Sequence, residues 1–316
     1  MSRNRENPNR PARAVRTRAL ALAAALAAAL PAPALAALRV VTTTQGLAAL
    51  AKEVGGDRVE VESLSRGVQD PHFVDASPVL AVKIRNAELL VDVGLELEAG
   101  WLPPLVVQSR NADVLPGRER RLTAASAVEV REAPTGPVDR SQGDVHPAGN
   151  PHFLADPRRA APVAAAIAAR LARLDPAGAP AYQARLEDFR KRLAAAEGRW
   201  RAALAPARGR AVVTHHRTLD YLLDFAGVRA AGFLEPRPGT APPPSYLAEL
   251  VGVVKAGGVK GILVESYYDR KAADVVGKLS GAKVLVVPGD VGAVKEASTY
   301  EAWLDLLVAA LAQAAG

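Results

Sequence analysis

Five histidines are the residues with the clearest chemical potential in this chain of 316 residues, and all lie in three short segments. The first segment contains His72, the second contains His146 and His152, and the third is the pair His215 and His216. Neutral imidazole nitrogens are good ligands for Zn²⁺ and related transition metals. A lone histidine is more often structural, but this clustering favours a metal site to which distant parts of the chain contribute.

His72 and His152 occupy the same local sequence frame. In each case an Asp or Asn precedes a proline, the histidine and a phenylalanine, and a capping residue followed by proline comes shortly afterwards. Proline fixes its own φ and restricts the residue before it, so each imidazole should have a defined direction just before a helix. The segments are Asp70-Pro71-His72-Phe73 with Ser77-Pro78, and Asn150-Pro151-His152-Phe153 with Asp156-Pro157.

The elements that must position these histidines alternate between strands and helices. Apolar β-branched runs and helical spacing alternate along residues 37–178, which is typical of a parallel α/β lobe. The polar segment Leu115–Gly149 is expected to be mostly exposed loop, with one strand-like patch at Ala127–Val130. The predicted strands are Leu38–Thr43, Val59–Leu64 and Leu89–Val93, and the predicted helices are Leu47–Val54, Pro78–Asn86 and Asp156–Leu174.

A long amphipathic helix is predicted at residues 179–205, because large apolar side chains recur at helical spacing among many charged ones. Residues 206–316 then resume the α/β alternation as a second lobe. The predicted architecture is two α/β lobes with parallel-type sheets joined by one backbone helix. The predicted elements of the second lobe are Ala211–Thr214, Thr218–Ala226, Tyr246–Ala256, Lys260–Val264, Ala272–Leu279, Lys283–Val287 and Tyr300–Ala314.

Loops that follow the strands of such sheets meet at the carboxyl edge, where ligands bind. The three histidine segments should therefore converge in a cleft between the lobes. Two acidic residues occupy similar positions after strands, Glu265 and Asp290, and either could supply a carboxylate. Three imidazoles with one carboxylate suit Zn²⁺, whereas Mn²⁺ prefers more oxygen ligands. Copper(II) also binds imidazole tightly, and affinity order alone does not exclude it.

Residues 1–36 are expected to be a cleaved signal peptide, so the protein should be exported to the periplasm. They combine six arginines and one acidic residue with the apolar run Ala19–Leu30 and the small-residue exit Ala34-Leu35-Ala36. These arginines account for most of the net charge of +7, so the composition does not indicate a nucleic-acid partner. The chain has no cysteine, which excludes thiolate ligands and predicts no lipid anchor.

These motifs together resemble the zinc and manganese solute-binding proteins of bacterial ABC importers. The resemblance implies two lobes bridged by a single long helix, with His72, His152, His216 and Asp290 as ligands. It favours His216 over His215, and a histidine at this third position indicates the zinc branch. The segments that carry it are Asp70-Pro71-His72, Gly149-Asn150-Pro151-His152, Val213-Thr214-His215-His216, Leu234-Glu235-Pro236-Arg237-Pro238-Gly239 and Val264-Glu265-Ser266-Tyr267-Tyr268-Asp269.

The function that the resemblance implies is capture of Zn²⁺ and its delivery to a membrane permease, by a monomer and without catalysis. A periplasmic protein that loads the metal is a further partner to consider, and contacts of His146 and His215 with the ion stay open. One alternative is a secreted zinc hydrolase with Glu265 as general base, although no His-Glu-x-x-His motif is present. Another is an adhesin or metal buffer of the same fold.

Overall fold

The computed structural model describes Met1 and residues 37–131, 146–237 and 239–316. The signal peptide expected at residues 1–36 therefore lies, apart from Met1, outside the described residues. The central part of the expected loop Leu115–Gly149 lies outside them as well. In the described parts of the chain, no helix combines the length and apolar character required to cross a membrane.

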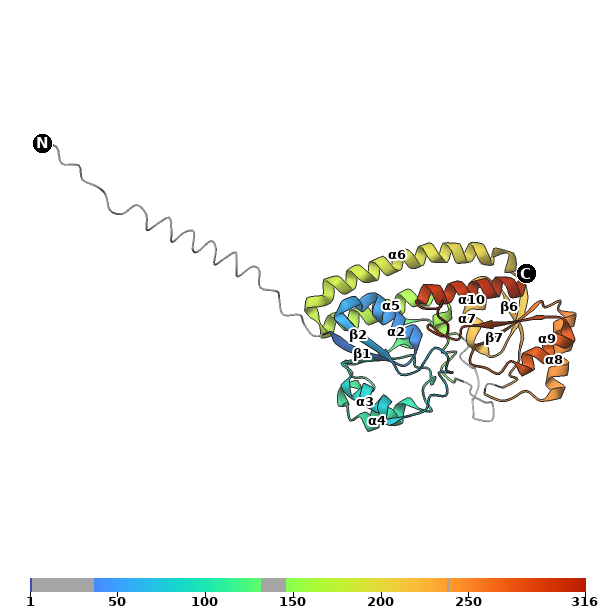
Figure 1. Cartoon of the computed structure of the whole chain (residues 1–316), viewed down its shortest axis with the longest axis horizontal. Helices are drawn as coiled ribbons and strands as arrows, with labels where there is room; N and C mark the ends of the chain where they lie inside the picture. Colours follow the sequence, from blue (N-terminus) through green and yellow to red (C-terminus); the bar gives the residue numbers. More distant parts are fainter. Residues whose placement is uncertain (2–36, 132–145, 238) are drawn as a thin grey trace. The chain divides into compact units, whose positions relative to one another are not determined.

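The first lobe is built on a parallel four-stranded sheet with the order β2-β1-β3-β4 (Figure 1). Alternate residues of its central strands pack on opposite faces: Leu89 and Val91 contact one apolar cluster, and Leu90 contacts another. Strands that are buried on both faces are typical of parallel sheets covered by helices. The strands are β1 (Leu38–Thr42), β2 (Val59–Ser63), β3 (Leu89–Asp92) and β4 (Arg121–Thr123), and the helices are α2 (Gln45–Gly55), α3 (Pro78–Asn86), α4 (Leu102–Ser109) and α5 (Pro157–Leu174).

The second lobe repeats this design with a parallel sheet in the order β6-β5-β7-β8. Val212 and Leu263 face the large cluster shared with the first lobe, whereas Val213 and Ile262 face a separate cluster beneath α8 and α9. The strands are β5 (Ala211–Thr214), β6 (Arg229–Phe233), β7 (Gly261–Glu265) and β8 (Lys283–Val287), and the helices are α7 (Asp220–Ala226), α8 (Pro244–Ala256), α9 (Lys271–Ser280) and α10 (Tyr300–Ala315).

The long helix α6 (Ala179–Leu204) runs along both lobes (Figure 1). It contacts α2 and α5 of the first lobe and α10 of the second. Its buried positions recur every three or four residues, which forms one apolar stripe along the helix. These positions are Tyr182, Leu186, Phe189, Leu193, Ala196, Trp200 and Leu204.

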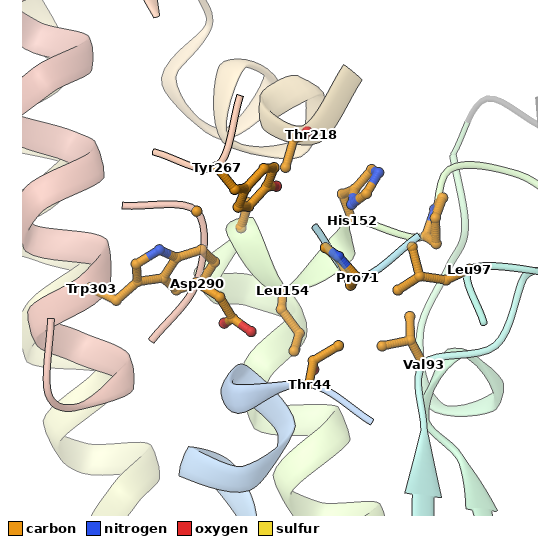
Figure 2. Close-up of a pocket in the computed structure, with 13 residues that line it drawn as sticks. Thr44, Pro71, Val93, Leu97, His152, Leu154, Thr218, Tyr267, Asp290 and Trp303 are labelled. Carbon is orange, nitrogen blue, oxygen red and sulfur yellow. The ribbon is translucent and has the colours of Figure 1, made fainter. Parts of the chain in front are cut away.

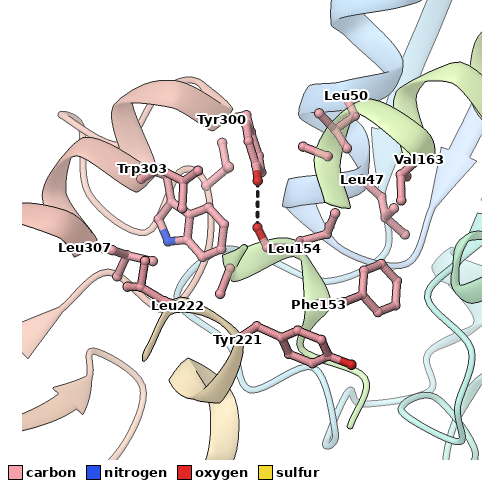
Figure 3. Packing of buried hydrophobic residues seen from close by; sticks show 14 of the residues in the cluster. Leu47, Leu50, Phe153, Leu154, Val163, Tyr221, Leu222, Tyr300, Trp303 and Leu307 are labelled. Atoms are coloured by element: carbon pink, nitrogen blue, oxygen red, sulfur yellow. Dashed lines mark hydrogen bonds between the residues drawn. The ribbon is translucent and has the colours of Figure 1, made fainter. Parts of the chain in front are cut away.

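One apolar cluster extends continuously from the first lobe to the second (Figure 3). At its centre, the hydroxyl of Tyr300 on α10 donates a hydrogen bond to the carbonyl of Leu154, 2.8 Å away. Trp303 packs beside Tyr300, with ring centroids 6.0 Å apart. The lobes therefore share a core, which limits their freedom to move as separate bodies.

The predicted fold of two α/β lobes with parallel sheets and one long helix is confirmed, but two local predictions differ from the structure. The strand-like patch predicted at Ala127–Val130 is wrong, because Ala124–Ala127 forms a 3₁₀ turn and the strand, β4, begins six residues earlier at Arg121. Strand β6 was not predicted, since its Ala-Ala-Gly centre has few of the β-branched residues that mark strands.

Candidate metal centre

His72 and His152 are held by the same local turn, although they lie 80 positions apart in the numbering. The side chain of Asp70 accepts a hydrogen bond from the backbone N–H of His72 at 2.9 Å. Asn150 does the same for the N–H of His152, also at 2.9 Å. An Asp or Asn that bonds the backbone two residues ahead forms an Asx turn, and the intervening proline stiffens it. The shared sequence motif therefore forms the same turn twice, and each turn fixes the direction of an imidazole.

His216 reaches the same place from the carboxyl end of β5. The hydroxyl of Thr214 donates to the carbonyl of His216 at 2.9 Å, which shapes the exit from the strand. Nδ1 of His216 lies 3.1 Å from Oε2 of Glu235, a residue in the loop after β6. This contact uses Nδ1 and leaves Nε2 of His216 free for another partner.

One ligand atom from each of His72, His152 and His216 lies within 4.8 Å of the other two. The ring centroids are 5.1 Å apart for His72 and His152, 5.3 Å for His72 and His216, and 5.4 Å for His152 and His216. Zn–N bonds of about 2.0–2.1 Å in a tetrahedron separate donors by roughly 3.4 Å, so a small contraction would place all three on one ion. In the part of the chain that the structure describes, this is the group with metal-binding geometry.

His146 lies against this group. Its Nε2 is 3.2 Å from Nε2 of His72, and the two rings are stacked with centroids 5.3 Å apart. The centroid of His146 is 6.3 Å from that of His152. His146 therefore lies beside His72 and His152, although it is outside the group of three whose ligand atoms lie within 4.8 Å of one another. The fifth, His215, stacks on Tyr268 with centroids 4.0 Å apart and lies outside the group.

The buried imidazoles of this group are neutral at physiological pH. Burial lowers the pKa of His146 from 6.5 to about 4 and lowers the pKa of His152 still more clearly, and neighbouring histidines add to both shifts. Burial also lowers the pKa of His216, although Glu235 opposes the change. Only neutral imidazole binds a metal ion, so the fold prepares these ligands in the required form.

Two carboxylates contact the histidines from outside the group. Oδ1 of Asp70 lies 2.7 Å from Nδ1 of His72, as Oε2 of Glu235 lies near His216. Burial raises the pKa of Glu235, but hydrogen bonds from His215 and His216 outweigh it and lower the pKa to about 2. Burial is likewise outweighed at Asp70, whose pKa the contacts with His72 lower. Such carboxylate–imidazole pairs fix the ring orientation and the tautomer of metal ligands. Both residues stand in the motifs of the sequence analysis, which assigned no role to either.

Asp290 is half-buried beside a small cavity of about 60 Å³ that His152 also lines (Figure 2). Its carboxylate is directed toward α2, where it accepts a hydrogen bond from the backbone N–H of Gln45 at 2.9 Å. It also accepts one from the backbone N–H of its neighbour Val291 at 2.7 Å. Burial raises its pKa to about 6, although these N–H groups favour the ionised form. Asp290 therefore accepts a hydrogen bond from a backbone N–H group at the start of α2 that has no partner within the helix. Asp290 does not belong to the histidine group.

Glu265 at the end of β7 is also buried, and neither of its carboxylate oxygens has a hydrogen-bond partner among the described residues. Burial raises its pKa to about 8, so the side chain is a neutral acid at pH 7. Of the carboxylates considered as fourth ligand from the sequence, neither Glu265 nor Asp290 joins the three histidines.

A protein-family model described as "Zinc-uptake complex component A periplasmic" (ZnuA) matches residues 40–314, which is most of the chain. The protein belongs to the ZnuA family. The two lobes and the long helix agree with membership of this family.

Curated relatives of this ZnuA-family chain bind different metals by name. The zinc-binding lipoprotein AdcA of Streptococcus pneumoniae is 24% identical over 254 residues, which cover 79% of this chain and 49% of AdcA. This chain thus spans about half the length of AdcA. The manganese ABC transporter substrate-binding lipoprotein PsaA of Streptococcus pneumoniae is 26% identical over 252 residues, covering 78% of each chain. Both names describe lipoproteins, unlike the unanchored protein expected from the absence of cysteine.

The fold agrees with solved structures of the ZnuA family. A crystal structure of a ZnuA deletion mutant with zinc bound superimposes with a TM-score of 0.74 at 22% identity, covering 89% of this chain and 98% of that one. At this identity the agreement concerns the fold alone. The metal that this chain carries therefore depends on its own side chains.

Proposed function

We propose that this protein binds Zn²⁺ through His72, His152 and His216 and delivers it from the periplasm to an ABC importer. The observation that carries the proposal is the convergence of three imidazoles, from loops of both lobes, within 4.8 Å of one another. His216 follows the carboxyl end of β5, which is the usual ligand position of such folds. The chemistry is transfer of an ion, and no covalent bond is made or broken.

The donor set favours Zn²⁺ over Mn²⁺. Imidazole nitrogen suits zinc, whereas manganese prefers carboxylate, carbonyl and water oxygens. The carboxylates of Asp70 and Glu235 contact the outer nitrogens of His72 and His216. Their negative charges therefore offset the charge of the ion without replacing nitrogen ligands, which supports zinc as the cargo.

An ion has a route to the site from the side of Glu235. A cavity of about 310 Å³ is lined by residues of both lobes, among them His72, His216 and Tyr268. Because the lobes share a core and α6 is continuous, we expect loading and release to need loop movements of modest size. The alternative of a zinc hydrolase with Glu265 as general base has less support, since no His-Glu-x-x-His motif is present in the sequence.

The test is metal analysis of the protein purified after export, combined with competition against a zinc chelator. Wild type should bind one Zn²⁺ per chain and prefer it to Mn²⁺. The single variants His72→Ala, His152→Ala and His216→Ala should each lose most of this affinity. Zinc stoichiometry and affinity unchanged in all three variants would refute the proposal.

A further inference from the structure

The three histidines leave one position of a tetrahedral ion to be filled. His146 contacts the group of three at His72, with its Nε2 3.2 Å from Nε2 of His72. Its ring centroid lies 5.3 Å from that of His72 and 6.3 Å from that of His152. The side chain is half-buried and comes from the segment just before Asn150 and His152.

The carboxylate expected at this position is engaged elsewhere. Asp290 accepts two backbone hydrogen bonds, from Gln45 and Val291, and faces the start of α2 (Figure 2). Moving it to the ion would leave buried N–H groups without a partner, at a cost of about 1–3 kcal/mol for each. A side chain that already touches His72 has no such penalty.

We infer that His146 is the fourth ligand and that four imidazoles, with no carboxylate, bind the ion. This inference rests on the proposed function and deepens it, because it names the feature that makes the site selective. A four-nitrogen site suits Zn²⁺ and offers Mn²⁺ none of the oxygen ligands that it prefers. The carboxylates of Asp70 and Glu235 then contact Nδ1 of His72 and His216 and supply negative charge next to these ligands, without touching the ion.

The experiment compares His146→Ala with Asp290→Asn in chelator-competition titrations with Zn²⁺ and Mn²⁺. Asn keeps the size of Asp290 and one acceptor oxygen, so α2 retains a partner. His146→Ala should lower the Zn²⁺ affinity at least as much as the roughly 10- to 100-fold loss typical of an outer-shell change. Asp290→Asn should stay within about threefold of wild type, since it removes no ligand. The opposite ranking would overturn the inference.

A second variant and a spectroscopic measurement keep the test independent of folding effects. His146→Asp restores a ligand but exchanges nitrogen for oxygen, so the ratio of Zn²⁺ to Mn²⁺ affinity should fall. Zinc X-ray absorption of wild type should fit four imidazoles, and the imidazole number should fall by one in His146→Asp. A carboxylate oxygen in the wild-type shell, or an unchanged imidazole number in the variant, would refute the assignment.

The failure of this inference is distinguishable from the failure of the proposed function. If His72→Ala, His152→Ala and His216→Ala lose zinc but His146→Ala does not, only the fourth ligand is wrong. If none of the four variants changes zinc binding, the proposed site itself is wrong.

Discussion

The imidazole of His216 and the carboxylate of Glu235 meet at 3.1 Å between Nδ1 and Oε2. The two residues follow adjacent parallel strands, since β5 ends two residues before His216 and β6 ends two residues before Glu235. The backbone joins them as well, because the N–H of Glu235 donates to the carbonyl of His215 at 3.1 Å. The sheet therefore fixes the carboxylate relative to the imidazole, and both residues can act on the metal as a unit.

Removal of this carboxylate should weaken zinc binding without abolishing it. We expect Glu235→Ala to lower the affinity by roughly 10- to 100-fold while one zinc per chain is still bound, because the His216 ring loses its orienting partner. Chelator competition measures the change. Glu235→Gln, which keeps an acceptor oxygen, should lose less, and equal losses would mean that the charge alone matters. An unchanged affinity in Glu235→Ala would contradict a positioning role.

The pH dependence of zinc binding should begin below the usual range for histidine. Protons compete with the metal only where the ligands are protonated. Burial lowers the pKa of His146 to about 4 and lowers the pKa of His152 well below its usual value. Between pH 7.5 and 6 we expect the affinity to fall by less than about tenfold. A loss of several hundredfold over this interval would show that the imidazoles titrate as exposed ones do.

The part of the site that local sequence determines could be predicted. The Asp-Pro-His and Asn-Pro-His frames act through turns of three residues, and the structure shows those turns at His72 and His152. The lobes and the long helix were predictable for the same reason, because apolar periodicity reports directly on a buried helix face or strand. Strand β4 was missed because it forms by pairing with β3, which is distant from it in the sequence.

The surroundings of the carboxylates could not be predicted from the sequence. Asp290 follows a strand as a ligand would, but its partner Gln45 lies 245 residues away, and only the packing of the lobes brings them together. Glu265 follows a strand in the same way and is an equal candidate for a metal ligand by sequence. In the structure its carboxylate is buried without a hydrogen-bond partner among the described residues. His146 stands in a polar segment with no strand or helix to orient it, so its contact with His72 required the folded chain.

Replacement of Glu98 should change how stability depends on pH. Burial raises its pKa to about 7, with Asp92 adding to the shift, although Thr43 and two backbone N–H groups favour the ionised form. An acid whose pKa rises on folding binds more protons in the native state, so its contribution to stability is lost as pH rises from 4.5 through about 7. Glu98→Gln should gain about 3 kcal/mol relative to wild type over this range, measured by urea unfolding at several pH values. A difference that does not vary with pH would contradict the buried acid.

The link between the lobes should depend on apolar packing and not on ion pairs. Arg192 on α6 bridges Glu53 of α2 and Glu301 of α10, but its side chain is 42% exposed. We expect Arg192→Ala to lower the free energy of unfolding by at most about 1 kcal/mol. Phe189→Ala, on the buried stripe of the same helix, should lower it by about 3–5 kcal/mol. Equal effects in denaturant titrations would be evidence against this ranking.

Gly67, in the loop that leads to His72, lies against the loop that follows Asp290, and its substitution should disturb both stability and metal binding. A Cβ at this position would lie 2.4 Å from the carbonyl of Val291 and 2.5 Å from the N–H of Ala293, both backbone atoms that cannot rotate away. Gly67→Ala must therefore separate the loop leading to His72 from the loop that follows Asp290. We expect a loss of about 1–3 kcal/mol in stability and a weaker zinc affinity.

The matched control is Gly198→Ala on α6, where a Cβ meets nothing within 4 Å. That change should add about 0.5–1 kcal/mol of stability and leave zinc binding unchanged. If both variants bind zinc like wild type, the spacing of the two loops does not control the site.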